Sequence, residues 1–156
     1  GVKGVDTNQY TAIYIPDPEY LVNRVSFPTT FSPENSPEGH YSVQAEITCR
    51  ADSDSWRMSD SAILTHVRGG LQQRGLLPKN AAEIVYQEVH RSKYSYVVYD
   101  VGFEKNAKII RDWFPAQGIH LLGRFSYFEY INIDGAVIRA REIIGQLNGA
   151  PISLGA

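Results

Sequence analysis

The residues best suited to ligand chemistry lie in one short stretch near the C-terminal end of the sequence. Gly123 and Arg124 follow an apolar run at 119–122, and the aromatic residues after them lead to Asn132. Beyond Asn132, apolar residues recur at intervals of one, three and four positions, which places them on one face of a helix. These residues are Ala136, Val137, Ala140, Ile144 and Leu147. The sequence therefore predicts a helix over 132–148.

The start of this predicted helix supplies the chemistry. Asn132 occupies the N-cap position, Asp134 lies in the first turn, and Gly149 follows the last apolar residue. The first turn of a helix has N–H groups without intrahelical partners and carries the positive end of the helix dipole, so it suits an anionic or electron-rich ligand atom. With a buried strand predicted at 119–122, the order is strand, Gly-Arg, aromatic loop and helix. Such junctions also occur without a ligand, so a binding site and a purely structural junction are both open from the pattern alone.

The composition of the whole chain excludes several classes of function. Its 156 residues are 43% hydrophobic and 21% charged, which is typical of one soluble globular domain, so we expect a single domain over 1–156. A net charge of −2 provides no field for nucleic acid or an anionic membrane, and no apolar run approaches the length of a membrane helix. A single cysteine, Cys49, fits a reducing cytoplasm. The start at Gly-Val-Lys-Gly, without Met, leads us to expect a segment of a longer chain.

The remaining elements position the junction. Three segments with alternating apolar residues are predicted to form an antiparallel sheet, and two segments with apolar residues on one face are predicted helices. Two further segments rich in β-branched and aromatic residues are predicted strands. In chain order the predicted elements are strands at 10–16, 21–27 and 41–49, a helix at 59–74, strands at 82–90 and 94–100, and a helix at 103–114. The fold class is therefore α+β: a mixed, largely antiparallel sheet with helices packed on it.

Other sources of chemistry are weak in this sequence. Asp52 and Asp54 are two carboxylates without further ligands, so they indicate a loop ahead of a helix and no metal site. The four histidines have no metal-ligand spacing, and no Ser-His-Asp or Cys-His arrangement supports a side-chain nucleophile. No G-x-G-x-x-G follows an opening strand, so the chain holds no dinucleotide-binding unit of its own.

The junction resembles the flavin segment of a known superfamily. Gly-Arg, five residues and then Tyr130-x-Asn132-Ile133-Asp134 is similar to the Gly-Arg, five residues, Tyr-x-Asp-Met-Asp of UDP-galactopyranose mutases. The stretch 133–137 also resembles the Met-Glu-Gly-Ala-Val of flavin amine oxidases and protoporphyrinogen-oxidase-like enzymes. Shorter similarities at 23–25, 43–46 and 94–98 follow in the same order, whereas 51–85 looks like an inserted segment.

This resemblance implies a C-terminal part of a two-domain FAD-binding flavoprotein. Its strands would belong to a substrate domain, and 119–148 would contact the flavin, with the N-terminal dinucleotide-binding half absent from the sequence. The implied FAD contacts are Gly123, Arg124, Asn132, Ile133, Asp134, Gly135 and Ala136. The implied substrate contacts are Arg24, Tyr96 and Tyr130, where mutases hold a diphosphate. FAD is expected in the full-length protein and not on this segment alone.

The resemblance leaves three functions open. The first is an FAD-dependent oxidoreductase, with the flavin carrying the chemistry and no catalytic side chain. The second is a mutase acting on a nucleotide sugar, although Asn132 replaces an aspartate and 26–28 lacks the histidine and lysine expected beside Arg24. The third is a non-catalytic interaction domain. The expected partners are the N-terminal FAD-binding half, a small-molecule substrate and, because an apolar junction would otherwise be exposed, a second copy of the chain.

Overall fold

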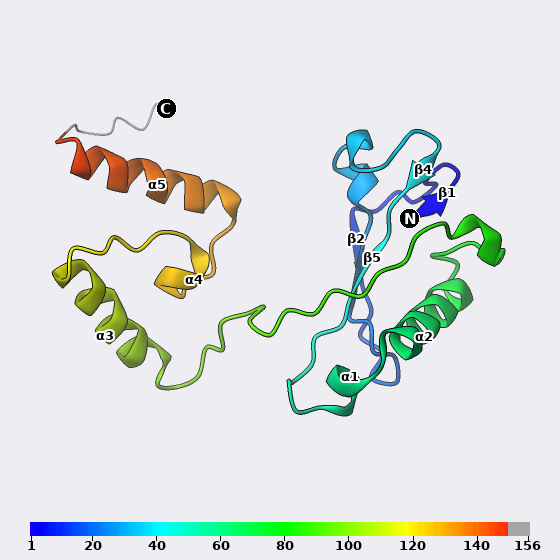
Figure 1. Ribbon diagram of the computed structural model, residues 1–156, viewed down its shortest axis with the longest axis horizontal. Helices are drawn as coiled ribbons and strands as arrows, with labels where there is room; N and C mark the ends of the chain where they lie inside the picture. Colours follow the sequence, from blue (N-terminus) through cyan, green and yellow to red (C-terminus); the bar gives the residue numbers. More distant parts are fainter. Residues whose placement is uncertain (150–156) are drawn as a thin grey trace. The chain divides into compact units, whose positions relative to one another are not determined.

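The computed structural model describes residues 1–149 and confirms the α+β class (Figure 1). It divides the chain into two compact units, residues 1–93 and residues 94–156, of which the second is described as far as residue 149. The first unit holds all the strands in the described chain, and the second is built from helices. The single domain predicted over 1–156 ends outside the described residues.

A three-stranded antiparallel sheet forms the centre of the first unit. Its strands are β2 (Ala12–Tyr14), β3 (Arg24–Ser26) and β5 (Gln44–Glu46), in the order β2-β3-β5. They lie inside the three predicted strands and confirm their antiparallel pairing. A second pair, β1 (Val2–Lys3) with β4 (His40–Tyr41), was not predicted.

Helix α2 (Asp60–Gln73) packs on one face of this sheet and closes the core. The predicted stripe is confirmed, because Leu71 is fully buried and Val67 packs beside it. The buried cluster consists of Tyr20, Val22, Val25, Phe27 and Leu71. Ser59 caps the helix by accepting a hydrogen bond from the Ala62 N–H, and Gly75 follows its end with a positive φ of 71°.

The loops of the first unit are organised by short helical turns. The predicted loop at Asp52 leads into α1 (Asp54–Arg57), which Ser53 caps, and the 3-10 turns are η1 (Pro28–Thr30), η2 (Pro33–Asn35) and η3 (Ala81–Glu83). The strand predicted over 82–90 is wrong: Asn80 caps η3, and only Ile84 forms a single bridge, with Val2. The strand predicted over 94–100 is wrong as well, since this segment has no regular structure. β propensity describes packing against neighbouring strands, and apart from the bridge of Ile84 to Val2 the described chain offers these segments none.

The second unit contains α3 (Phe103–Ala116), α4 (Arg124–Tyr127) and α5 (Ile133–Leu147), which follow one another through two loops (Figure 1). Both predicted helices of this unit are confirmed, although Pro115 lies in the last turn of α3 and does not end it. The strand predicted over 119–122 is wrong, because these residues have no regular structure and only Leu121 is buried. Gly149 follows α5 with φ of 64°, as expected for a helix end.

Candidate functional site

Three of the residues implied by the flavoenzyme resemblance lie together in the second unit. The guanidinium of Arg124 lies 4.3 Å from the centre of the Tyr130 ring and 5.4 Å from that of Tyr96. A cation at this distance is attracted to the negative face of an aromatic ring. Both rings are largely accessible, with Tyr96 57% and Tyr130 70% exposed. The arrangement holds a positive charge beside two open aromatic surfaces, which suits an anion attached to a flat or sugar-like group.

The backbone around Arg124 creates this arrangement. Gly123 has φ of 91° and ψ of 170°, a conformation that side chains rarely adopt, and α4 begins directly after it. The aromatic loop predicted here is therefore partly a helix of one turn. Phe128 ends that turn in the left-handed conformation, and the Glu129 N–H donates to the Arg124 carbonyl at 3.1 Å. This reversal returns the chain so that Tyr130 lies beside Arg124.

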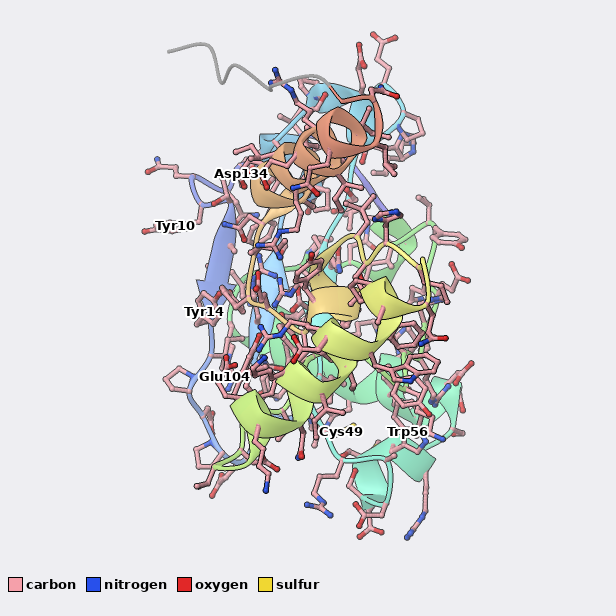
Figure 2. The ribbon with its side chains drawn as sticks, turned by 90° about the vertical axis from the view of Figure 1, so that its left-hand side faces the viewer. Tyr10, Tyr14, Cys49, Trp56, Glu104 and Asp134 are labelled. Atoms are coloured by element: carbon pink, nitrogen blue, oxygen red, sulfur yellow. The ribbon has the colours of Figure 1, made fainter. Side chains whose placement is uncertain are left out.

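The start of α5 lies two residues beyond Tyr130. Asn132 stands at the N-cap position as predicted, but its side chain makes no capping hydrogen bond. Ile133 is 84% exposed, and the first hydrogen bond of the helix is donated by the Ala136 N–H to the Asn132 carbonyl. The N–H groups at 133–135 therefore have no intrahelical acceptor. Figure 2 labels Asp134 in this first turn.

Gly135 lies where a side chain would be crowded. A Cβ atom at this position would come within 3.3 Å of the Ile131 side chain. The chain leading into α5 therefore passes close to the first turn of the helix, and glycine permits that approach. This helix start is open and presents N–H groups without intrahelical partners.

Arg24 belongs to the first unit and has a different environment. The strand register aligns Tyr14, Arg24 and Glu46 across β2, β3 and β5 on the face opposite the core, where Tyr14 is exposed (Figure 2). The Arg24 Nη1 is 2.5 Å from Glu46 Oε1, and the guanidinium is 5.8 Å from the centre of the Tyr14 ring. Its Nε is buried without a hydrogen-bond partner. Arg24 is therefore neutralised by Glu46, and it could bind a phosphate only by exchanging that partner.

Sequence reasoning missed the ion pairs that surround Glu129. Arg111 of α3 and Arg139 of α5 both approach this carboxylate, at 3.6 Å and 2.7 Å. No sequence signal marks the contact, since the two arginines belong to separate helices, where they are partly buried, and Glu129 lies in a loop. The contact depends on how α3 and α5 pack.

The shifted pKa values belong to groups of the first unit. Burial raises the pKa of Tyr20, an effect that Arg74 partly offsets, and burial with the nearby Asp6 and Glu83 raises the pKa of Tyr41. The hydrogen bond from Arg50 lowers the pKa of Asp52. Each shift is explained by a structural contact.

Neither a metal site nor a membrane helix is found in the described part of the chain. Over residues 1–149, no three His, Cys, Asp or Glu side chains come together as metal ligands would. Every helix in that range is too short or too polar to span a bilayer.

The sheet with its packed helix and the arginine beside a helix start define an α+β fold with a candidate anion site. The fold matches that of a solved protein, a reduced UDP-galactopyranose mutase, with a TM-score of 0.73 and 21% sequence identity. The match covers 97% of this chain and 33% of the mutase chain, so the present chain spans about a third of the length of that enzyme. No protein-family model and no curated protein matches the sequence. The likeness establishes the fold alone.

Proposed function

We propose that this chain is the C-terminal, ligand-contacting part of a flavin-dependent enzyme whose substrate carries a diphosphate, as a nucleotide sugar does. The observation that carries the proposal is the position of Arg124 on the rings of Tyr96 and Tyr130. All three residues are implied by the resemblance to UDP-galactopyranose mutases. Arg124 and Tyr130 are close in the sequence, whereas Tyr96 is far from both. The match of the fold to such a mutase supports the same assignment.

The charge of Arg124 favours an anionic substrate. Arg24, Arg111 and Arg139 are all paired with carboxylates, whereas Arg124 makes no ion pair within residues 1–149. A guanidinium presents a planar set of donors that matches two phosphate oxygens. The tyrosine rings contact the guanidinium of Arg124 and leave its N–H donors available. A diphosphate would therefore gain charge-assisted hydrogen bonds without displacing a carboxylate.

The start of α5 fits one part of FAD. Its open N–H groups at 133–135, with no side-chain cap from Asn132, suit the electron-rich pyrimidine edge of the ring system. The bound flavin would supply the chemistry at the substrate, and this chain would bind and orient both molecules. The sequence contains no glycine-rich βαβ unit for the ADP portion, so we assign that task to the N-terminal half of a longer polypeptide.

An FAD-dependent oxidoreductase of the amine-oxidase or protoporphyrinogen-oxidase type is the second candidate. Two observations favour it over a mutase. Asn132 is neutral where mutases have aspartate, and the residues after Arg24 are buried in the core, because Ser26 and Phe27 are almost inaccessible. Conversion of a UDP-sugar without net oxidation would identify a mutase, whereas consumption of an electron acceptor would identify an oxidoreductase.

The test uses the full-length polypeptide and the variant Arg124→Ala. We expect turnover to fall by about 100-fold, as for the loss of one preorganised donor, and the free energy of unfolding to change by no more than about 0.5 kcal/mol. Arg141→Ala is the matched control, because Arg141 is an exposed arginine of α5 without an ion pair in the described chain. Unchanged turnover and unchanged UDP binding in folded Arg124→Ala would remove Arg124 from the site. A colourless protein that takes up no FAD would instead favour a non-catalytic domain.

A further inference from the structure

Glu129 connects three elements of the second unit. Its Oε2 lies 2.7 Å from Nη1 of Arg139 on α5, and its Oε1 lies 3.6 Å from Nη1 of Arg111 on α3. The three side chains are only 21% to 32% exposed: Arg111 21%, Arg139 25% and Glu129 32%. One carboxylate is therefore the ion-pair partner of Arg139 and the second partner of Arg111, whose closer carboxylate is that of Glu104 at 2.5 Å. We call these three residues the Glu129 clamp.

The clamp is attached to the loop that forms the candidate site. Glu129 directly precedes Tyr130, and its N–H donates to the carbonyl of Arg124 at 3.1 Å. The guanidinium of Arg139 also lies 4.3 Å from the centre of the Tyr127 ring, at the end of α4. The clamp thus contacts both the end of α4 and the loop that follows it, and Arg124 and Tyr130 belong to that same segment.

Charge contributes more than hydrogen-bond geometry to this contact. The Nη1 atom of Arg139 is buried and close to Glu129 without the alignment that a hydrogen bond requires. Ion pairs removed from water are screened less than exposed ones. Removing the charge of Glu129 would leave the partly buried Arg139 without an ion-pair partner in residues 1–149, whereas Arg111 would keep Glu104.

We propose that Glu129 is a positioning residue for the candidate site: paired with Arg111 and Arg139, it fixes the loop that sets Arg124 on the ring of Tyr130. This inference rests on the proposed function for the role of Arg124, but the fixation of the loop is a separate property. A guanidinium that must meet a diphosphate in one orientation loses affinity when its support is loose.

The first experiment measures the loop without any ligand. In the full-length protein, Glu129→Gln keeps the shape of the side chain and removes its charge. We expect amide hydrogen exchange across residues 124–132 to become about 10-fold faster than in the wild type, because local opening becomes easier. The matched control is Glu104→Gln, since Glu104 pairs with the same Arg111 at 2.5 Å but belongs to α3 itself. Equal exchange rates in this segment for the two variants would overturn the proposal.

The second experiment measures UDP binding and uses a double-mutant cycle. We expect Glu129→Gln to raise the Kd for UDP by about 10-fold. In a protein that already carries Arg124→Ala, the same change should raise the Kd hardly further, because both substitutions act through one guanidinium. Glu129→Asp, which keeps the charge on a shorter side chain, should restore part of the affinity. Two results would overturn the positioning role. One is that the losses of binding free energy in the two single variants add fully in the double variant. The other is that Arg124→Ala raises the Kd for UDP and Glu129→Gln leaves it unchanged. Faster exchange together with no effect of Arg124→Ala on UDP would support the clamp and refute the proposed function.

Discussion

The two units of the chain differ in how they hold their side chains. In residues 1–93, strand and helix residues share a dry core, with Val22, Val25 and Phe27 fully inaccessible. In residues 94–149, few large apolar side chains are buried, and Leu121 is one of them. Both units contain ion pairs, but in the latter unit Glu104, Arg111, Glu129 and Arg139 join into one connected network.

This difference shows where the chain leaves apolar side chains exposed. The stripe of α5 predicted to face a core is open at Val137, Ile144 and Leu147, all more than half exposed. Exposed apolar faces of this extent mark surfaces that another protein surface covers. Most of the exposed large apolar side chains of the described chain lie in residues 94–149.

The largest difference in stability between the two units is expected from Phe27→Ala. Removing a fully buried aromatic ring should lower the free energy of unfolding of the first unit by about 3–5 kcal/mol, because a cavity remains. Each unit contains one tryptophan, so Trp113→Phe leaves Trp56 to report urea unfolding of residues 1–93, and Trp56→Phe leaves Trp113 to report the other unit.

Phe125→Ala is the control for this prediction. Phe125 is half exposed in α4, so its truncation should cost about 1 kcal/mol or less, in the second unit alone. Equal shifts of both tryptophan signals in Phe27→Ala would show that the two units unfold as one and would break the comparison.

An intermediate loss of stability is expected from a substitution at Gly70, where α2 contacts the loop before β3. A Cβ atom at Gly70 would lie 2.0 Å from the Tyr20 ring, whose hydroxyl donates to the Val67 carbonyl at 2.9 Å. Gly70→Ala should therefore destabilise the first unit by about 1–3 kcal/mol through overpacking.

Gly69→Ala provides a matched control in the same helix. A Cβ atom there meets nothing within 4 Å, so this variant should gain about 1 kcal/mol from helix propensity. Urea midpoints read from Trp56 give both values. Stabilisation by both substitutions would mean that Tyr20 does not pack against α2.

The smallest effect concerns the ionisation of Tyr20. Burial raises the pKa of Tyr20 above its ordinary value of 10.0, against a smaller lowering by Arg74. The unfolded chain therefore loses this proton first, so the contribution of Tyr20 is complete below pH 10 and falls as the pH rises further. Tyr20→Phe should cost about 0.5–1.5 kcal/mol at pH 8 through the lost hydrogen bond.

The difference between wild type and Tyr20→Phe should then shrink above pH 10, when Tyr20 ionises in the unfolded wild-type chain. Urea midpoints of both proteins at pH 8 and pH 10.5 test this. A constant difference would show that Tyr20 titrates equally in the folded and unfolded states.

What the sequence could predict depends on whether the signal is local. Helix α2 was predicted over 59–74 and forms over Asp60–Gln73, because the signals of its cap, its apolar face and its end each lie within a few residues of the feature they specify. The strands at 82–90, 94–100 and 119–122 were predicted wrongly for a related reason. Their composition fits a strand, but a strand also needs a neighbour, and local composition does not contain one.

The candidate site shows the same limit. The resemblance named Arg124, Tyr96 and Tyr130, but it gave no reason for a guanidinium to lie on two rings. The partners of Arg24 and Glu129 were not predicted at all, because an ion pair between Arg24 and Glu46 depends on strand register and the Glu129 clamp depends on helix packing.

The left-handed backbone of Phe128 has a consequence for sequence variation. A residue other than glycine at φ of 55° costs about 1–2 kcal/mol, and the cost is higher for side chains branched at Cβ. Among related chains that keep this turn, position 128 should accept Gly, Asn and Asp and exclude Val, Ile and Thr, whatever the ligand. The residue type at this position thus indicates whether a related chain can reverse its backbone after α4. That reversal places the residue equivalent to Tyr130 beside the one equivalent to Arg124.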